Sequence, residues 1–283
     1  MNEWAEVWRY RALLWGLVRR DLKVRYKNSV LGFVWSLLNP LLQILVFVIA
    51  FRYMMGLGGR NYSAKLFVAM LPWMFFSQGL LDSSASVAGQ VGLVKRVYFP
   101  RLILPLSVLM SNLVHFLLGM TVLAAYFTVR KVTIAWPHLP LAFLAFGVQF
   151  MFMCGMAFAV SSLSVYYNDV RFLLGSIMQM WLFLSPVFYS AEGAIARLGE
   201  MGLPDFLGTV YLLNPMAPVL MSYRALLPYD GARASTNDYL AVLHQVLPGF
   251  PVYFAIAAAV ALAAFVLGFS LFRRLQWRFA ELG

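Results

Sequence analysis

Residues Val252–Phe272 read VYFAIAAAVALAAFVLGFSLF, a segment that is long, apolar and free of charged side chains. A bilayer core of ~30 Å requires roughly 20 helical residues, and this stretch meets that length. Arg273 and Arg274 follow directly, where a spanning helix would return to water. The stretch therefore predicts a membrane-spanning helix.

Other apolar stretches of similar length indicate that the chain crosses the bilayer repeatedly. The six expected spans are Val30–Arg52, Leu66–Val87, Ile103–Val129, Leu141–Val165, Phe172–Tyr189 and Val252–Phe272. Strands of a membrane barrel would instead alternate polar and apolar side chains over ~10 residues. We therefore expect an all-α integral membrane protein with six transmembrane helices.

The composition excludes a separate soluble domain. Of the 283 residues, 62% are hydrophobic and only 12% are charged. A soluble domain has about half apolar and about a quarter charged residues. The formal net charge of +11 would suggest nucleic-acid binding in a soluble protein. Here the basic residues lie beside apolar stretches, which favours membrane orientation and anionic headgroups, so we expect no nucleic-acid partner.

Most of the 22 Lys and Arg residues fall in segments on one side of the predicted membrane. These segments are the N-terminal arm, the loops after the second and fourth spans, and the C-terminal tail. Short segments rich in Lys and Arg stay in the cytoplasm, so we expect both termini there.

Residues 1–29 form an arm in which aromatic and basic side chains recur at helical spacing. Such a segment lies in the membrane interface as an amphipathic helix, and residues 30–283 then form the transmembrane domain. Two roles stay open for the arm: a simple anchor, or an anchor that is also a basic collar for a lipid pyrophosphate. Guanidinium groups suit a collar because they hold phosphate oxygens in bidentate pairs. The collar residues would be Arg19, Arg20, Lys23, Arg25 and Lys27.

Residues 190–249 form the longest segment between predicted spans. Its apolar part, Val210–Leu227, is broken by Pro215 and Pro218. Broken helices occur at membrane depth only where protein or a water-filled cavity covers them. The segment therefore reads as a re-entrant or interfacial hairpin on the outer face, with a loop lying on the headgroups as the alternative.

Polar and aromatic side chains lie along several predicted spans, and helix packing explains most of them. A minority would line a path for a hydroxyl-rich solute. These channel-lining candidates are Trp35, Asn39, Gln43, Trp73, Phe76, Trp181, Phe188 and Tyr189. Asp82 is the only acidic residue well inside a span, which makes it a candidate functional residue of open role.

The chain lacks the motifs of common enzymes. Its three His residues lie far apart, without the spacing of metal ligands, and Cys154 has no second cysteine to pair with. No phosphate-binding loop of the Gly-x4-Gly-Lys-Ser/Thr type occurs. We therefore expect no catalytic residue, metal or cofactor in this chain, and any energy for transport would come from a partner or an ion gradient.

Several motifs carry a resemblance to a known family. They are Arg20–Gly32 (RDLKVRYKNSVLG), Gly92–Arg101 (GLVKRVYFPR), Tyr166–Arg171 (YYNDVR), Leu184–Tyr189 (LSPVFY) and Leu213–Met216 (LNPM). The chain resembles the permease subunits of polysaccharide ABC exporters, the O-antigen, capsule and teichoic-acid group. It departs from the family pattern at Asn168, where a basic residue is often found.

This resemblance implies a multi-pass protein of the bacterial inner membrane that forms a homodimer with a channel at the dimer interface. It also implies a separate subunit that binds ATP and Mg²⁺, and a cargo glycan carried on polyprenyl pyrophosphate. Residues 190–249 would hold the extracytoplasmic gate. By resemblance, the residues that couple to the ATPase are Lys95, Arg96, Phe99, Arg101, Asp169 and Arg171.

Two other functions stay open. An ion-coupled flippase for lipids or glycolipids, or a secondary carrier, would need ionisable groups inside spans, and the chain offers Asp82 and His115. A membrane glycosyl or acyl transferase would need convergent acids or histidines at a span end, whereas the acids of the outer segments are scattered.

Overall fold

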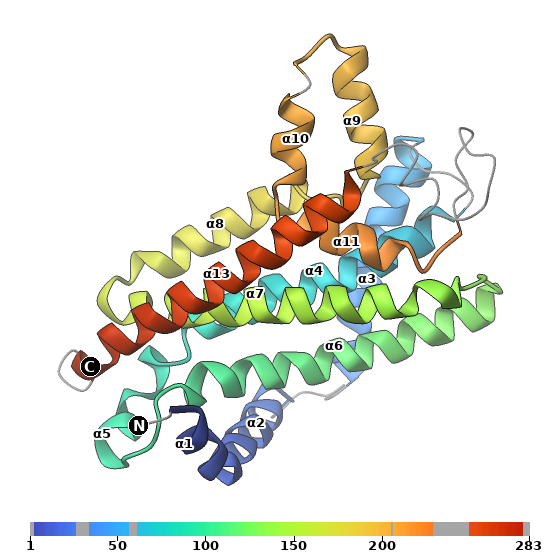
Figure 1. The fold of residues 1–283 in the computed structure, drawn as a ribbon. Coiled ribbons are helices and arrows are strands. Elements are labelled where there is room, and N and C mark those ends of the chain that lie inside the picture. The colour runs from blue at the N-terminus through green and yellow to red at the C-terminus, as the bar shows by residue number, and fades with distance from the viewer. Residues whose placement is uncertain (1–2, 27–33, 57–60, 205, 229–248, 280–283) are drawn as a thin grey trace.

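The computed structural model describes residues 3–26, 34–56, 61–204, 206–228 and 249–279. Over these ranges every regular element is a helix, which confirms the all-α class (Figure 1). In chain order the elements are α1 (Glu3–Arg9), α2 (Arg11–Tyr26), α3 (Val34–Phe47), the π-helical η1 (Val48–Met54), α4 (Tyr62–Ser84), η2 (Ala88–Gln90), α5 (Val91–Arg96), α6 (Ile103–Arg130), η3 (Trp136–His138), α7 (Leu139–Tyr166), α8 (Asp169–Phe183), α9 (Ala191–Glu200), α10 (Phe206–Leu212), α11 (Met216–Arg224), α13 (Phe250–Leu275) and η4 (Gln276–Arg278).

Among the described residues, four helical segments are long and apolar enough to cross a membrane: α4, α6, α7 with η3, and α13. They coincide with four of the predicted spans. In α4, 72% of the apolar window is buried, against 17% in α13. The helix α4 is therefore the centre of the bundle, and α13 presents most of its surface outward.

The other two predicted spans are shorter as helices, so the six-span count is not confirmed. The first predicted span, Val30–Arg52, begins outside the described residues. Its described part overlaps the shorter apolar helix Leu38–Met54, which runs from α3 into η1. The fifth is α8, which has 15 residues and ends at Phe183. Pro186 explains this end, because proline lacks a backbone N–H and disfavours helical geometry in the residue before it.

The N-terminal arm folds as two helices rather than one, and both pack on the bundle. α2 lies along α6. From α1, Trp4 stacks on Phe265 and Phe269 of α13, with ring centroids 6.0 and 5.7 Å apart. The N-terminal helix and the C-terminal end of α13 therefore meet at one end of the bundle, beside α5 (Figure 1).

The segment before α13 divides at Asn214 and Pro215. On one side, α9 and α10 project from the bundle as a hairpin (Figure 1). On the other, α11 is buried along its whole length and packs against α4, α7 and α13. The break at Pro215 is therefore observed, whereas Pro218 lies in the first turn of α11, where the missing N–H costs no helical hydrogen bond. A re-entrant course through the membrane stays a prediction.

Two glycines let α7 and α13 approach at backbone distance. A Cβ at Gly155 would meet backbone atoms of Ala264 and Phe265, and a Cβ at Gly268 would meet the backbone of Gly155. Small residues at such crossings allow the close van der Waals packing that holds membrane helices together.

We predict that Gly268→Ala lowers the stability of the detergent-solubilised protein by about 1–3 kcal/mol, because the added methyl group forces α7 and α13 apart. The measurement is the midpoint of thermal unfolding. Gly147→Ala on α7 is the matched control, since a Cβ there meets nothing within 4 Å. It should leave the midpoint unchanged or raise it, because alanine favours the helix by up to about 1 kcal/mol. Equal effects of the two substitutions would contradict the packing role of Gly268.

Candidate functional site

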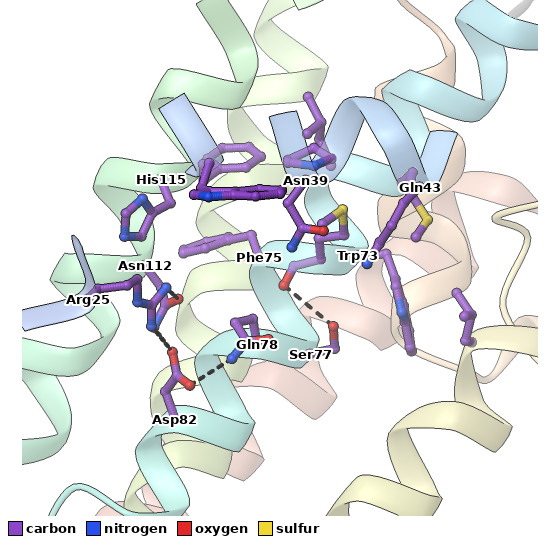
Figure 2. Close-up of a pocket in the computed structure, with 17 residues that line it drawn as sticks. Arg25, Asn39, Gln43, Trp73, Phe75, Ser77, Gln78, Asp82, Asn112 and His115 are labelled. Atoms are coloured by element: carbon purple, nitrogen blue, oxygen red, sulfur yellow. Dashed lines mark hydrogen bonds and ion pairs between the residues drawn. The ribbon is translucent and has the colours of Figure 1, made fainter. Parts of the chain in front are cut away.

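A cavity of about 870 Å³ opens between α3, α4 and α6, and α2 contributes Arg25 to it (Figure 2). It is lined by Arg25, Trp35, Asn39, Pro40, Gln43, Met70, Leu71, Trp73, Met74, Phe75, Ser77, Gln78, Asp82, Asn112, His115, Phe116 and Leu182. We call this cavity the central pocket. Ionisable side chains are rare between membrane helices and are candidates for a functional role.

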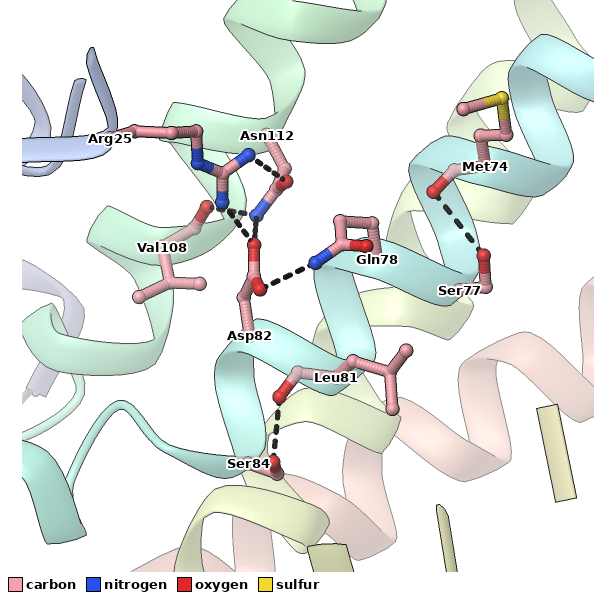
Figure 3. Close-up of polar contacts among 9 residues, drawn as sticks. All are labelled: Arg25, Met74, Ser77, Gln78, Leu81, Asp82, Ser84, Val108 and Asn112. Carbon is pink, nitrogen blue, oxygen red and sulfur yellow. Dashed lines mark hydrogen bonds and ion pairs between the residues drawn. The ribbon is translucent and has the colours of Figure 1, made fainter. Parts of the chain in front are cut away.

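One end of the central pocket holds a charged network. Arg25 of α2 forms an ion pair with Asp82 of α4 (Figure 3). The amide of Gln78 donates to Asp82 Oδ1 at 2.7 Å, and the amide of Asn112 on α6 donates to Asp82 Oδ2 at 3.0 Å. Arg25 Nη1 also lies 3.5 Å from Asn112 Oδ1. The network thus joins three helices through one carboxylate.

The ion pair is reachable from the central pocket. Its side chains are 37% exposed for Arg25 and 24% for Asp82. A carboxylate between membrane helices is costly unless it is paired and hydrogen-bonded, and here both of its oxygens are occupied. The sequence identified both residues separately but gave no sign that they pair.

The other part of the central pocket is aromatic and uncharged. Trp35, Asn39 and Gln43 come from α3, and Trp73 comes from α4. Figure 2 shows the amides of Asn39 and Gln43 on the same side of the cavity as Trp73. Amide groups can donate to and accept from hydroxyls, and an aromatic face can pack on the apolar face of a sugar ring.

The channel-lining candidates fall into two groups. Trp35, Asn39, Gln43 and Trp73 gather around the central pocket. The others lie in aromatic packing outside it. In that second group, Phe76 is fully buried between Phe152 and Trp181, Phe188 packs on Phe47 and Phe51, and the Tyr189 hydroxyl donates to the Phe183 carbonyl at 2.7 Å.

A buried arginine fixes the turn that follows α8. Arg224 of α11 is only 4% exposed and donates to the carbonyls of Val187 at 2.8 Å and Tyr189 at 2.5 Å. Tyr62 of α4 donates to the carbonyl between them, that of Phe188, at 3.0 Å. Backbone carbonyls away from water require such partners. The sequence analysis missed Arg224, although it is the one charged residue in the apolar stretch Val210–Leu227, which is a signal for a functional or structural role.

Asn214 connects the same turn to α11. Its Oδ1 accepts from the Trp181 indole at 2.9 Å and from the Met216 backbone N–H at 3.1 Å. Its Nδ2 donates to the Leu184 carbonyl at 3.2 Å and to Ser185 Oγ at 3.0 Å. One side chain therefore ties the end of α8 to the start of α11.

A second cavity, of about 520 Å³, lies where the two ends of the chain meet the loop before α6. We call it the terminal cleft. It is lined by Glu3, Glu6, Lys95, Val97, Tyr98, Phe99, Pro100, Arg101, Leu102, Arg273, Gln276 and Trp277. Arg273 forms an ion pair with Glu3 at 2.9 Å. Arg101 lies over the Phe279 ring, 5.9 Å from its centroid, and burial lowers the pKa of its guanidinium.

Only some of the residues predicted to couple to the ATPase lie together. Lys95, Phe99 and Arg101 line the terminal cleft, whereas Asp169 and Arg171, at the start of α8, are not among its lining residues. The Arg96 side chain lies outside the described part of the structure.

The collar candidates are also divided. Arg19 and Lys23 are exposed on α2, Arg20 pairs with its neighbour Asp21 at 2.9 Å, and Arg25 turns into the central pocket. Lys27 lies outside the described residues.

Apolar helices of membrane length around a cavity with polar walls define an integral membrane protein of the transporter class. Residues 12–227 match the model of the ABC-2 type transporter family, and the chain belongs to this family. The resemblance carried by the sequence motifs is thereby confirmed.

Curated relatives match most of the chain. It is 30% identical over 275 residues to the O-antigen export system permease protein RfbA of Klebsiella pneumoniae, across 95% of this chain and 94% of that protein. It is 30% identical over 221 residues to the protein of the same name from Myxococcus xanthus, across 78% and 82%. It is 22% identical over 248 residues to the capsule polysaccharide export inner-membrane protein CtrC of Neisseria meningitidis serogroup A, across 84% and 87%.

We predict that Asn214→Ala lowers the free energy of unfolding in detergent by about 1–3 kcal/mol, because it leaves part-buried donors of Trp181 and Met216 without their acceptor. Thermal unfolding followed by tryptophan fluorescence measures this directly, since Trp181 loses its hydrogen-bond acceptor. Gln179→Ala, which removes an exposed amide on α8, is the control and should be close to neutral. A neutral Asn214→Ala variant would show that the turn after α8 is held by other contacts.

Proposed function

We propose that this chain is the membrane-spanning permease subunit of an ABC exporter for lipid-linked polysaccharide, an O-antigen-like glycan on polyprenyl pyrophosphate. One observation carries the proposal: the similarity to O-antigen export permeases extends over 95% of the chain, through the spans and the loops between them. Family membership favours this function over an ion-coupled carrier. The pairing of Asp82 with Arg25 also ties up the acid that such a carrier would use.

The motor would be a separate subunit. The sequence contains no phosphate-binding loop of the Gly-x4-Gly-Lys-Ser/Thr type, so ATP and Mg²⁺ would bind to the partner. The terminal cleft, with Lys95, Phe99 and Arg101, is the surface on which that subunit would dock. Arg96, Asp169 and Arg171 complete the proposed coupling residues.

The central pocket would form part of the path of the glycan. Trp35, Asn39, Gln43 and Trp73 would face the cargo, while Phe76, Trp181, Phe188 and Tyr189 would support that wall from behind. α3 and η1 carry an exposed apolar face that includes Leu42, Leu45 and Val46, which suits a second copy of the chain across the channel.

The termini, the remaining spans and the outer segment would be arranged as in an exporter of the bacterial inner membrane. Both termini would be cytoplasmic, and α3 with η1, and α8 with the turn after it, would complete six crossings. The basic residues Arg19, Arg20, Lys23, Arg25 and Lys27 would attract the lipid pyrophosphate at the entrance. Residues 190–249 would form the gate on the outer side.

We predict that the triple variant Lys95→Glu, Arg96→Glu, Arg101→Glu loses co-purification of the ATPase subunit, because it reverses three charges in the segment proposed to dock that subunit. Surface glycan should be lost in cells that depend on this exporter, while the amount of the variant in the membrane stays normal.

The matched control reverses three basic residues at the other end of the bundle: Arg130→Glu, Lys131→Glu and Arg197→Glu. These changes should leave the ATPase bound. Normal co-purification with the first triple variant would remove the coupling assignment, and normal surface glycan in the absence of the chain would remove the proposed function.

A further inference from the structure

In the central pocket, the Asp82 carboxylate has more described hydrogen-bond partners than the Arg25 guanidinium beside it. Asp82 accepts three donors, from Arg25, Gln78 and Asn112, and these occupy both of its oxygens. A guanidinium has five N–H donors, and the described contacts of Arg25 use only Nη1 and Nη2. Counting only contacts with the described residues, Arg25 therefore has donors left over on a side chain that is 37% exposed.

The carboxylate of Asp82 occupies the position that a phosphate would take against Arg25. Guanidinium groups bind carboxylates and phosphates with the same fork of N–H donors. If Arg25 turned to another anion, Asp82 would still be hydrogen-bonded by Gln78 and Asn112. The Asp82 carboxylate therefore keeps two hydrogen-bond donors when Arg25 exchanges its partner, which lowers the cost of losing the guanidinium.

The rest of the central pocket indicates what lies beside that anion. From the charged end the cavity continues past Asn112 and His115 to the amides of Asn39 and Gln43 and the ring of Trp73 (Figure 2). Its volume of about 870 Å³ holds more than a single phosphate. A charged end followed by amides and an aromatic ring fits a phosphate ester joined to a hydroxyl-bearing ring.

We propose that Asp82 is a resident counter-anion, which the phosphate of a glycosyl phosphate displaces from Arg25 when the ligand enters the central pocket. That this phosphate belongs to a lipid headgroup rests on the proposed function. Because Arg25 belongs to α2 and Asp82 to α4, the exchange breaks the ion pair between these two helices. A ligand in the pocket would thereby weaken the contact of α2, in the N-terminal arm, with the bundle.

The test is binding of farnesyl pyrophosphate to the purified full chain in nanodiscs of uncharged lipid, with inorganic pyrophosphate and farnesol as separate arms. Asp82→Asn removes the competing charge but keeps an acceptor for Gln78 or Asn112. We expect it to bind farnesyl pyrophosphate at least about fivefold more tightly than the wild type, which is the lower end of the usual range for coupling between a ligand and another group. Arg25→Gln should abolish the binding, and the double variant should behave like Arg25→Gln.

Glu200→Gln is the matched control, because it makes the same change in net charge on α9, outside the central pocket. It should bind like the wild type. Size-exclusion profiles of all variants establish that they are folded. The double variant removes both charges, so it shows whether the loss of binding in Arg25→Gln comes from the missing guanidinium and not from an unpaired Asp82. Equal or weaker binding by Asp82→Asn, or binding of farnesol as tight as that of the pyrophosphate, would overturn the proposal.

The arms also identify the source of the phosphate. Preference for farnesyl pyrophosphate over inorganic pyrophosphate supports a lipid headgroup, and equal binding supports a free phosphate in the same site. Either result, with the expected order of variants, supports the displacement of Asp82 from Arg25. The assay involves no transport and no ATPase. A chain that shows this order of affinities but exports no glycan would refute the proposed function and leave the counter-anion role intact.

Discussion

The structure depends on one constraint: a charge or backbone polar group that lies away from water must find its partner within the protein. The ion pair between Arg25 and Asp82 meets this constraint for the charged end of the central pocket. Arg224 meets it for the carbonyls of the turn after α8. In both places a polar contact also joins elements that are distant in sequence, so the same interactions that satisfy polar groups set the arrangement of the helices.

This arrangement explains how a mostly apolar chain holds a cavity with polar walls. The central helix α4 packs against α6, α7 and α11, and its polar side chains Gln78 and Asp82 point into the pocket rather than toward lipid. Close contact of α7 with α13 at Gly155 and Gly268 closes the other side of the bundle. The apolar outer surface and the polar pocket are thus two faces of the same helices, as transport of a polar cargo through a membrane requires.

Periodicity and length were sufficient to predict α4, α6, α7 and α13, because a long, mostly apolar run without the alternation of a barrel strand forms a helix in lipid. They were insufficient for α3 with η1 and for α8, where Pro186 and a change to π-helical geometry set the boundaries. Arg25 and Asp82 were each identified, yet their pairing across 57 residues depends on how α2 lies along α6, which local patterns do not encode. Likewise, the aromatic candidates divide into pocket walls and buried supports only when the helices are packed, as Phe76 shows.

We claim that this chain forms the path of the glycan and that a separate ATPase subunit supplies the energy. Reconstitution separates these two roles. Proteoliposomes would carry the purified chain with or without its ATP-binding subunit, and a glycan on polyprenyl pyrophosphate would be supplied on the outside. Protection of the glycan from an added glycosidase then measures its movement into the lumen. We predict protection only when both subunits and ATP are present, whereas protection by this chain alone, with no ATPase subunit, would contradict the claim.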